Sequence, residues 1–249
     1  SVLRDKAQTI APKVDNYVDF VGTGGDCTYS FNISTTSAFV VAAAGVPVAK
    51  HGNRSISSKS GAGDVLEALG VNISADPQIV EKCVEEAGIG FMFAPHFNLA
   101  MKYVGPVRKE MGIRTVFNIL GPLSNPSRAK AMIVGVYSPK LTAVIAGTMM
   151  NLGVERGFVV SGCDNMDEFT LTGPSTVSEI KDGKVTTYEV FPEQFGLSRC
   201  KIEELQGGDG TVNAQITKDI LSGKEQGAKR EIVLLNAGAA LYIGGKADS

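Results

Sequence analysis

Three short stretches of this sequence carry residues that could do chemistry, and the first is GTGGD at residues 22–26. Its three glycines let the backbone turn tightly and expose N–H groups, which together form an anion-binding site. Residues 32–36 (NISTT) and the apolar run 38–44 then predict the start of a helix with hydroxyl caps. The free N–H groups and positive dipole end of such a helix favour a phosphate. The glycine spacing fits neither a Walker loop nor a dinucleotide fingerprint.

The second stretch is KHGNR at residues 50–54, directly after a predicted strand at 46–49. Lys50 can pair with a phosphate as a point charge, and Asn53 can hydrogen-bond a substrate amine or carbonyl. A solvated surface turn is the ordinary alternative, although such a turn rarely follows a buried strand directly. A lone histidine such as His51 is more often structural than catalytic.

The third stretch holds Asp167 and Glu168, six residues after a predicted strand at 157–161. Adjacent loop carboxylates are usually just solvated, but close to phosphate-binding loops they become candidate ligands for magnesium, which prefers oxygen. Asp26 supports this interpretation, since it would repel a phosphate unless a cation bridged the two. Arg108, on a predicted helix at 98–111, is either an exposed helix charge or a clamp for a carboxylate.

The elements that must position these residues follow an alternating pattern. Predicted strands lie at residues 18–21, 46–49, 89–94, 131–137 and 157–161 and are separated by predicted helices, while Asp182-Gly183 within residues 176–190 indicates a hairpin. The alternation predicts an α/β fold with a mainly parallel central sheet flanked by helices on both faces. In such sheets ligands bind at the carboxyl edge of the strands, where the glycine turn and residues 50–54 should meet.

Composition excludes several classes of protein. The chain has 249 residues, 43% of them apolar, and a net charge of −2, which gives no strong field for nucleic acid or an anionic membrane. Four scattered cysteines without a CxxC motif argue against a metal–thiolate site and fit a reducing, cytoplasmic compartment. The longest apolar stretch, residues 38–49, contains Gly45 and Pro47 and is too short to span a bilayer.

Taken together, the motifs resemble one family. VGTGGD, NISTTSA, VAKHGNRSISSKSG, GDVLEALG, PVRKEMGIRTVFNILGPLSNP and DEFTLTGP occur in order over nearly the whole chain. This set is similar to the anthranilate phosphoribosyltransferases, whose fold is nucleoside phosphorylase/phosphoribosyltransferase-like. The resemblance implies transfer of the phosphoribosyl group of PRPP to the amine of anthranilate in tryptophan biosynthesis, with release of pyrophosphate and a requirement for Mg²⁺.

The resemblance also implies roles for individual residues. PRPP would be held by Gly22, Thr23, Gly25, Asp26, Asn32, Ser34, Thr35, Lys50 and Ala62. Anthranilate would be contacted or guided by Gly22, His51, Asn53, Arg108 and Gly121. Magnesium would be held by Ser34, Asp167 and Glu168. No residue is assigned as a general base, because the aromatic amine of anthranilate is neutral at pH 7 and needs little activation.

The chain departs from the family pattern at several positions. Cys27 stands where the family usually has glycine, Ala62 where many members have serine, and Asn98-Leu99 where His-Pro is usual. We expect residues 1–11 to be the remnant of an N-terminal helical domain and residues 12–249 to be the α/β domain, with further C-terminal helices missing. Since the helical domain supplies the homodimer contact in the family, we expect weaker dimerisation and reduced activity.

Two alternatives remain open at this level. A pyrimidine nucleoside phosphorylase-like enzyme would use phosphate as the nucleophile, and the pairing of KHGNR with Asp167-Glu168 suits pyrophosphate with Mg²⁺ better. A non-enzymatic, nucleic-acid-binding paralogue would need basic grooves, which the net charge of −2 does not favour.

Overall fold

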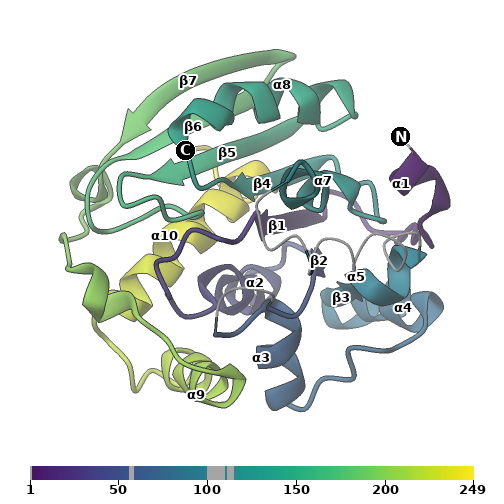
Figure 1. The fold of residues 1–249 in the computed structure, drawn as a ribbon, viewed down its shortest axis with the longest axis horizontal. Helices are drawn as coiled ribbons and strands as arrows, with labels where there is room; N and C mark the ends of the chain where they lie inside the picture. The colour runs from purple at the N-terminus through teal and green to yellow at the C-terminus, as the bar shows by residue number, and fades with distance from the viewer. Residues whose placement is uncertain (1, 56–58, 100–109, 111–114) are drawn as a thin grey trace.

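The computed structural model describes residues 2–55, 59–99, 110 and 115–249 and contains one seven-stranded sheet (Figure 1). Its strands are β1 Val18–Gly22, β2 Val48–Gly52, β3 Ile89–Phe93, β4 Ala131–Gly135, β5 Arg156–Gly162, β6 Ser175–Lys181 and β7 Lys184–Val190. The order across the sheet is β3-β2-β1-β4-β5-β6-β7. β3, β2, β1, β4 and β5 pair in parallel, and β6 and β7 add an antiparallel hairpin. The mainly parallel sheet predicted from the sequence is therefore confirmed.

The strand order reverses at β1. The chain moves from β1 to β2 and β3 on one side, and then returns to place β4 on the other side of β1. In open α/β sheets the crevice beyond the carboxyl ends of the strands at such a reversal is where ligands bind. The fold therefore directs attention to the loops that follow β1 and β2.

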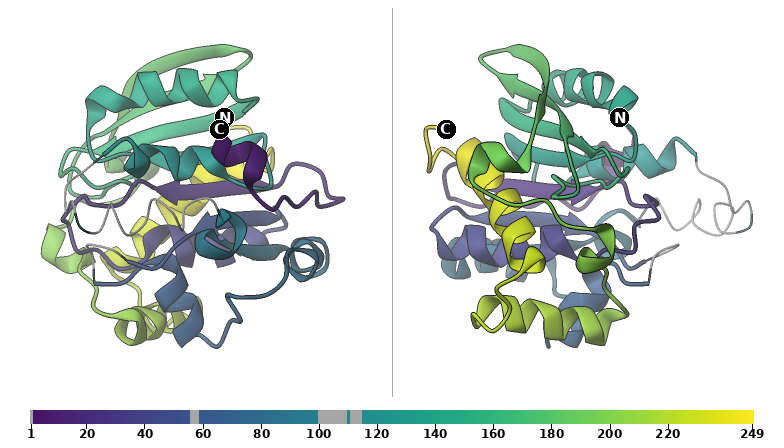
Figure 2. Two further views of the ribbon diagram at one scale, coloured as in Figure 1. Left: turned by 45° about the vertical axis from the view of Figure 1, so that its right-hand side comes forward. Right: turned by 90° about the vertical axis from the view of Figure 1, so that its left-hand side faces the viewer.

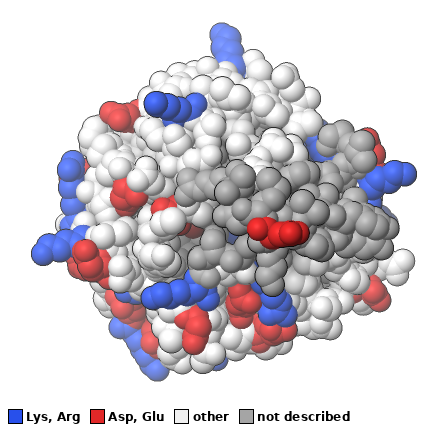
Figure 3. All heavy atoms as spheres, in the orientation of Figure 1, with Lys and Arg blue, Asp and Glu red and all other residues white. Residues whose placement is uncertain are grey.

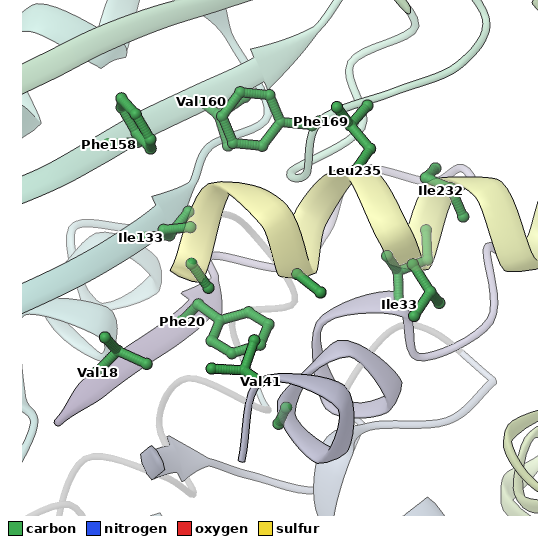
Figure 4. Close-up of a cluster of buried hydrophobic side chains, with 14 of the residues drawn as sticks. Val18, Phe20, Ile33, Val41, Ile133, Phe158, Val160, Phe169, Ile232 and Leu235 are labelled. Atoms are coloured by element: carbon green, nitrogen blue, oxygen red, sulfur yellow. The ribbon is translucent and has the colours of Figure 1, made fainter. Parts of the chain in front are cut away.

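Helices cover both faces of the sheet, and the alternation of side chains along the strands explains why. Val18 and Phe20 of β1 point to one face, where they pack with α2 (Ile33–Ala43) and α10 (Ala228–Ile243) in the largest core cluster (Figure 4). Met132 and Val134 of β4 point to the other face and pack against α8 (Thr142–Asn151). Figure 2 shows α10 and α8 on opposite sides of the strands.

Smaller clusters attach the outer helices to the sheet. α4 (Pro77–Ala87) packs on β3 through Val80, Val84 and Met92, and α3 (Ala62–Ala68) contacts α9 (Gly210–Leu221). The remaining α-helices are α1 Val2–Lys6, α5 Ala94–Phe97 and α7 Phe117–Leu120, and the 3-10 helices are η2 Pro122–Ser124, η3 Pro139–Leu141, η4 Pro192–Phe195 and η5 Ile202–Leu205. Within the part of the chain that the structure describes, no helix has the length and apolar character to cross a membrane.

Two boundaries differ from the sequence prediction, and a third predicted helix is mostly outside the described residues. β2 begins at Val48 and runs to Gly52, so Lys50 and His51 belong to the strand itself, where parallel pairing with β3 continues through Gly52. The sequence predicts a helix over residues 65–69 capped by Asp64, but α3 begins after Gly61. Asp64 therefore sits inside its first turn, accepting bonds from the N–H groups of Gly61 and Ser55. The helix predicted at 98–111 lies mostly outside the described residues, and Asn98 itself follows the end of α5.

Candidate active site

A cavity of about 480 Å³ lies where the loops after β1 and β2 meet the N-terminus of α2. Every described residue that the sequence assigned to a ligand lines this cavity: Gly22, Thr23, Gly25, Asp26, Asn32, Ser34, Thr35, Lys50, His51, Asn53, Ala62, Gly121, Asp167 and Glu168. Arg108 lies outside the described residues. Side chains more than 140 positions apart in the sequence thus share one cavity.

The glycine turn is fastened to the carboxyl end of β4 and to Asp167. The Thr23 N–H donates to the Gly135 carbonyl at 2.9 Å, and the Gly24 N–H donates to Asp167 Oδ2 at 2.7 Å. Gly24 has φ of +66°, a conformation that favours glycine. A Cβ on Gly22 would collide with the Asp167 carboxylate, and one on Gly135 would overlap the Asp167 backbone. Glycine is needed at both positions because Asp167 packs directly against these strand ends.

Cys27, where the family usually has glycine, adopts φ of +62°. This is the left-handed region, which costs an L-residue with a side chain roughly 1–2 kcal/mol. The backbone therefore explains why glycine suits this position, and the turn keeps its shape with cysteine present.

An acidic group formed by Asp26, Asp167 and Glu168 lies on one wall of the cavity. One carboxylate oxygen from each residue lies within 4.8 Å of the others. Burial, and then the charge of Asp26, raise the pKa of Asp167 to about 6. Burial and the neighbouring Asp167 and Asp26 raise the pKa of Glu168 well above its usual range. Three close carboxylates in a buried site repel one another unless a cation neutralises them.

These residues fit a divalent cation with oxygen ligands. Glu168 Oε2 is buried and has no hydrogen-bond partner among the described residues, so it has an unused lone pair inside the protein. Asp26 holds the hydroxyl of Thr28 at 2.7 Å, which fixes the direction of its carboxylate. All three ligand atoms are hard oxygens, as magnesium prefers.

Lys50 supplies the positive charge of the cavity. Its side chain points to the face of the sheet that carries α2, is only 3% exposed, and donates from Nζ to the Phe20 carbonyl at 2.6 Å and to Ser34 Oγ at 3.3 Å. Burial lowers the pKa of Lys50, and the nearby Asp19, Glu168 and Asp167 oppose that shift. The predicted metal residue Ser34 thus lies directly beside the ammonium group.

The N-terminus of α2 opens onto the same space. Ser34 and Thr35 in its first turn line the cavity. The helix start predicted from the sequence is confirmed, but the expected side-chain caps are not: Asn32 precedes the helix and makes no capping bond. The Asn32 side chain instead bonds to the carbonyl and hydroxyl of Ser60, at 3.2 and 3.1 Å, and so joins the first polar loop to the second.

The other end of the cavity lies on the face of the sheet opposite Lys50 and α2, where His51 points. His51 is 3% exposed, and its Nε2 lies 2.9 Å from Nδ2 of Asn98. Burial and the charge of Lys50 lower the pKa of His51 to about 4, so the ring is neutral at pH 7. Gly121 and Pro122 form the wall nearby, and Asn53 is exposed at the rim, where its Oδ1 accepts from the Arg54 N–H at 2.7 Å.

Sequence reasoning missed two residues that support this site. Asp19 is fully buried, accepts from the His51 N–H at 3.1 Å and from Nδ2 of Asn125, and lies close enough to Lys50 to interact with its charge. Burial raises the pKa of Asp19 to about 6. A charged residue inside the apolar run at residues 18–21 was the available signal for Asp19. No feature of the sequence around Asn125 pointed to its role in the same way.

Comparisons with known proteins agree with this geometry. Residues 14–249 match the family model described as "Glycosyl transferase family, a/b domain". The anthranilate phosphoribosyltransferase of Acetivibrio thermocellus is 56% identical over 243 residues, which cover 98% of this chain and 70% of that protein. The crystal structure of the Thermus thermophilus anthranilate phosphoribosyltransferase has a TM-score of 0.94 and 45% identity, covering 99% of this chain and 73% of that one. The Saccharomyces cerevisiae enzyme in complex with PRPP and Mg has a TM-score of 0.88 and 31% identity, covering 98% and 68%.

Proposed function

The chain belongs to the anthranilate phosphoribosyltransferase family, and we propose that its cavity transfers the phosphoribosyl group of PRPP to the amine of anthranilate. Pyrophosphate leaves in this reaction, which is a step of tryptophan biosynthesis. One observation carries the proposal: a buried lysine, an acidic group and an open helix N-terminus meet in one cavity. A diphosphate with its counter-ion needs these three features together.

PRPP would occupy the end of the cavity beside α2. The N–H groups of Ser34 and Thr35 would bind its phosphate oxygens, with the glycine turn, Asn32 and Ala62 beside them. The Lys50 ammonium has three donors, of which Phe20 and Ser34 take two, so the third can reach an anion in the cavity. As the bond between C1 and pyrophosphate breaks, negative charge gathers on the leaving group, and the buried ammonium stabilises it.

Asp167 and Glu168, with Asp26 and Ser34 close by, would hold magnesium. When bound there, the ion supplies charge neutralisation for the leaving pyrophosphate. The protein's own part is to fix the carboxylates: the Gly24 N–H holds one oxygen of Asp167, and Thr28 holds one oxygen of Asp26. This arrangement lets anionic groups approach an acidic wall that would otherwise repel them.

Anthranilate would bind at the other end, where His51, Asn53, Gly121 and Gly22 line the space. Arg108, which the family resemblance also assigns to anthranilate, lies outside the described residues. His51 is neutral at pH 7, because its pKa is about 4, and can therefore accept or donate a single hydrogen bond without attracting or repelling charge. We assign no general base. Catalysis would come from holding the neutral amine against C1 of the ribose as that carbon gains oxocarbenium character, and from electrostatics.

Three further parts of the proposal concern the setting of the enzyme. We propose a cytoplasmic location, which the four free cysteines support. We propose a homodimer. We propose no nucleic-acid partner: on the face drawn in Figure 3, the described acidic and basic side chains are interspersed and form no continuous basic track.

The test is the loss of anthranilate fluorescence on addition of PRPP and Mg²⁺. The chain should consume anthranilate only when both are present. A second sample should be given a pyrimidine nucleoside with inorganic phosphate, to detect a phosphorylase. A third should be passed over a column of single-stranded DNA, to detect salt-sensitive binding of nucleic acid. Turnover of the nucleoside, or retention on the DNA, in the absence of anthranilate consumption would overturn the proposal.

A further inference from the structure

A chain of partly buried amide hydrogen bonds runs from α9 to the phosphate end of the cavity. Asn213 in the first turns of α9 is 1% exposed and lies behind the cavity wall. Its Oδ1 accepts from the Gly208 N–H at 2.8 Å, and its Nδ2 donates to Asn32 Oδ1 at 2.8 Å. Asn32 in turn donates from Nδ2 to the Ser60 carbonyl at 3.2 Å.

The donor-to-acceptor direction of these hydrogen bonds is fixed at the Gly208 end. The Gly208 N–H can only donate, so Asn213 must present its oxygen there and its NH₂ group to Asn32. Asn32 must then present its oxygen to Asn213, which directs its own NH₂ group toward Ser60. The Ser60 carbonyl can only accept and requires the same orientation of the Asn32 amide, which Asn213 supports from the other side.

The same region also anchors the loop that leads into α2. Gly207 donates its N–H to the Tyr29 carbonyl at 2.9 Å, Ser30 pairs with Gln206 in an isolated bridge, and Phe31 donates its N–H to the Leu205 carbonyl at 3.1 Å. Tyr29, Ser30 and Phe31 line the cavity, whereas residues 205–208 stand behind them. A Cβ on Gly207 would meet Asn213 Oδ1 and Phe31, so the two segments are packed without spare room.

We infer that Asn213 is a positioning residue for the phosphate end of the cavity. It acts through Asn32: together with the Ser60 carbonyl it holds the orientation of that amide, and with it the register between the loop that leads into α2 and the loop that carries Ser60. Since both loops would contact PRPP, this inference rests on the proposed function. It predicts that loss of Asn213 weakens binding of PRPP and leaves anthranilate binding and the chemical step nearly unchanged.

The chain offers a matched control in Thr217, one turn further along α9. Its hydroxyl is buried and lies 2.8 Å from the Thr36 hydroxyl of α2, so it too joins α9 to α2 by a buried hydrogen bond. Thr36 does not line the cavity. Thr217→Val removes this hydrogen bond without touching the Asn32 amide, and it should lower stability to a similar degree as loss of Asn213.

The experiment compares Asn213→Leu, Asn213→Asp and Thr217→Val with the unmodified chain. Asn213→Asp keeps the shape and the acceptor for Gly208 but turns the donor to Asn32 into a second acceptor, so it tests the orienting bond if the leucine variant folds poorly. The uncharged leucine variant separates this effect from that of the added negative charge. Both Asn213 variants should raise the KM for PRPP about tenfold, equivalent to about 1.4 kcal/mol, with kcat and the KM for anthranilate within about twofold. Thr217→Val should leave all three constants within about twofold.

Calorimetric titration of Mg²⁺ and PRPP into each protein, with thermal unfolding alongside, completes the test. A rise of Kd for PRPP in the Asn213 variants alone supports the inference. Equal changes in the Asn213 and Thr217 variants, or unchanged PRPP binding in the Asn213 variants, would show that Asn213 is merely structural. Absence of both turnover and PRPP binding in the unmodified chain would instead overturn the proposed function.

Discussion

Replacing Asp167 by asparagine should stabilise the metal-free protein while removing its activity. The substitution keeps the size of the side chain and an oxygen for the Gly24 N–H, but it removes one of three carboxylates whose oxygens lie within 4.8 Å of one another. Without a cation these charges are buried and repel one another. The carboxylates that would bind the cation therefore lower the stability of the cation-free protein.

The size of the effect follows from the pKa of Asp167, which burial and Asp26 raise from 3.8 to about 6. Each unit of such a shift corresponds to about 1.4 kcal/mol, so at pH 8 the ionised group destabilises the folded state by about 3 kcal/mol. Because the folded-state pKa is the higher one, this penalty is absent below pH 3.8 and develops as the pH rises through about 6. Asp167→Asn should thus be more stable than the parent at pH 8 and similar at pH 4.

Urea unfolding in EDTA at both pH values measures this difference, with Asp164→Asn as the control. Asp164 lies in the same loop and accepts bonds from Met166, Thr170 and Thr172 but is not part of the acidic group, so its replacement should destabilise the protein at both pH values. Addition of Mg²⁺ and PRPP should stabilise the parent far more than Asp167→Asn. A destabilised Asp167→Asn at pH 8, or equal stabilisation of both proteins by Mg²⁺ and PRPP, would refute the reasoning.

Three further predictions concern the same cavity. Gly22→Ala should lower kcat/KM for PRPP roughly a hundredfold, about 2.7 kcal/mol, because its Cβ displaces the Asp167 carboxylate. Gly147→Ala in α8 is the control: a Cβ there meets nothing within 4 Å, so the steady-state rate should be unchanged. Lys50→Met should reduce kcat roughly a thousandfold with little change in the KM for anthranilate, and comparable kinetics with methionine would exclude a role for the ammonium at the leaving pyrophosphate. Burial raises the pKa of Asp19 from 3.8 to about 6. The stability that protonated Asp19 contributes to the folded state is therefore full below pH 3.8 and is lost as the pH rises through 6. The free energy of unfolding, measured by chemical denaturation across pH 4–8, should fall less steeply with pH in Asp19→Asn.

Much of the fold could be predicted from the sequence because the strands are short apolar runs and the helices carry clear starts. Residues 18–21 are almost entirely apolar, as a strand buried on both faces must be, and Pro77 and Gly88 bound α4. The Asp182-Gly183 signal gave the hairpin correctly, since both residues adopt positive φ angles, +51° and +69°.

The site was predictable where a residue's own chemistry reveals its role, and not where the role depends on partners. Lys50, Asp167 and the glycine turn stand out because charge or glycine in those places needs a reason. Asn213 and Asn125 act through hydrogen bonds to residues more than 70 positions away, and no local pattern encodes such contacts. The extent of β2 was missed for a related reason, because pairing with β3 keeps the polar residues Lys50 and His51 in the strand.

Anomalous diffraction from a crystal soaked with PRPP and Mn²⁺ tests the central claim most directly, because Mn²⁺ takes the same oxygen ligands as Mg²⁺ and can be located without ambiguity. We expect a Mn²⁺ peak bound by carboxylate oxygens of Asp167 and Glu168, with the pyrophosphate of PRPP between that ion, Lys50 and the N-terminus of α2. A well-occupied PRPP molecule away from Lys50 and α2, or a Mn²⁺ peak that contacts neither Asp167 nor Glu168, would contradict it.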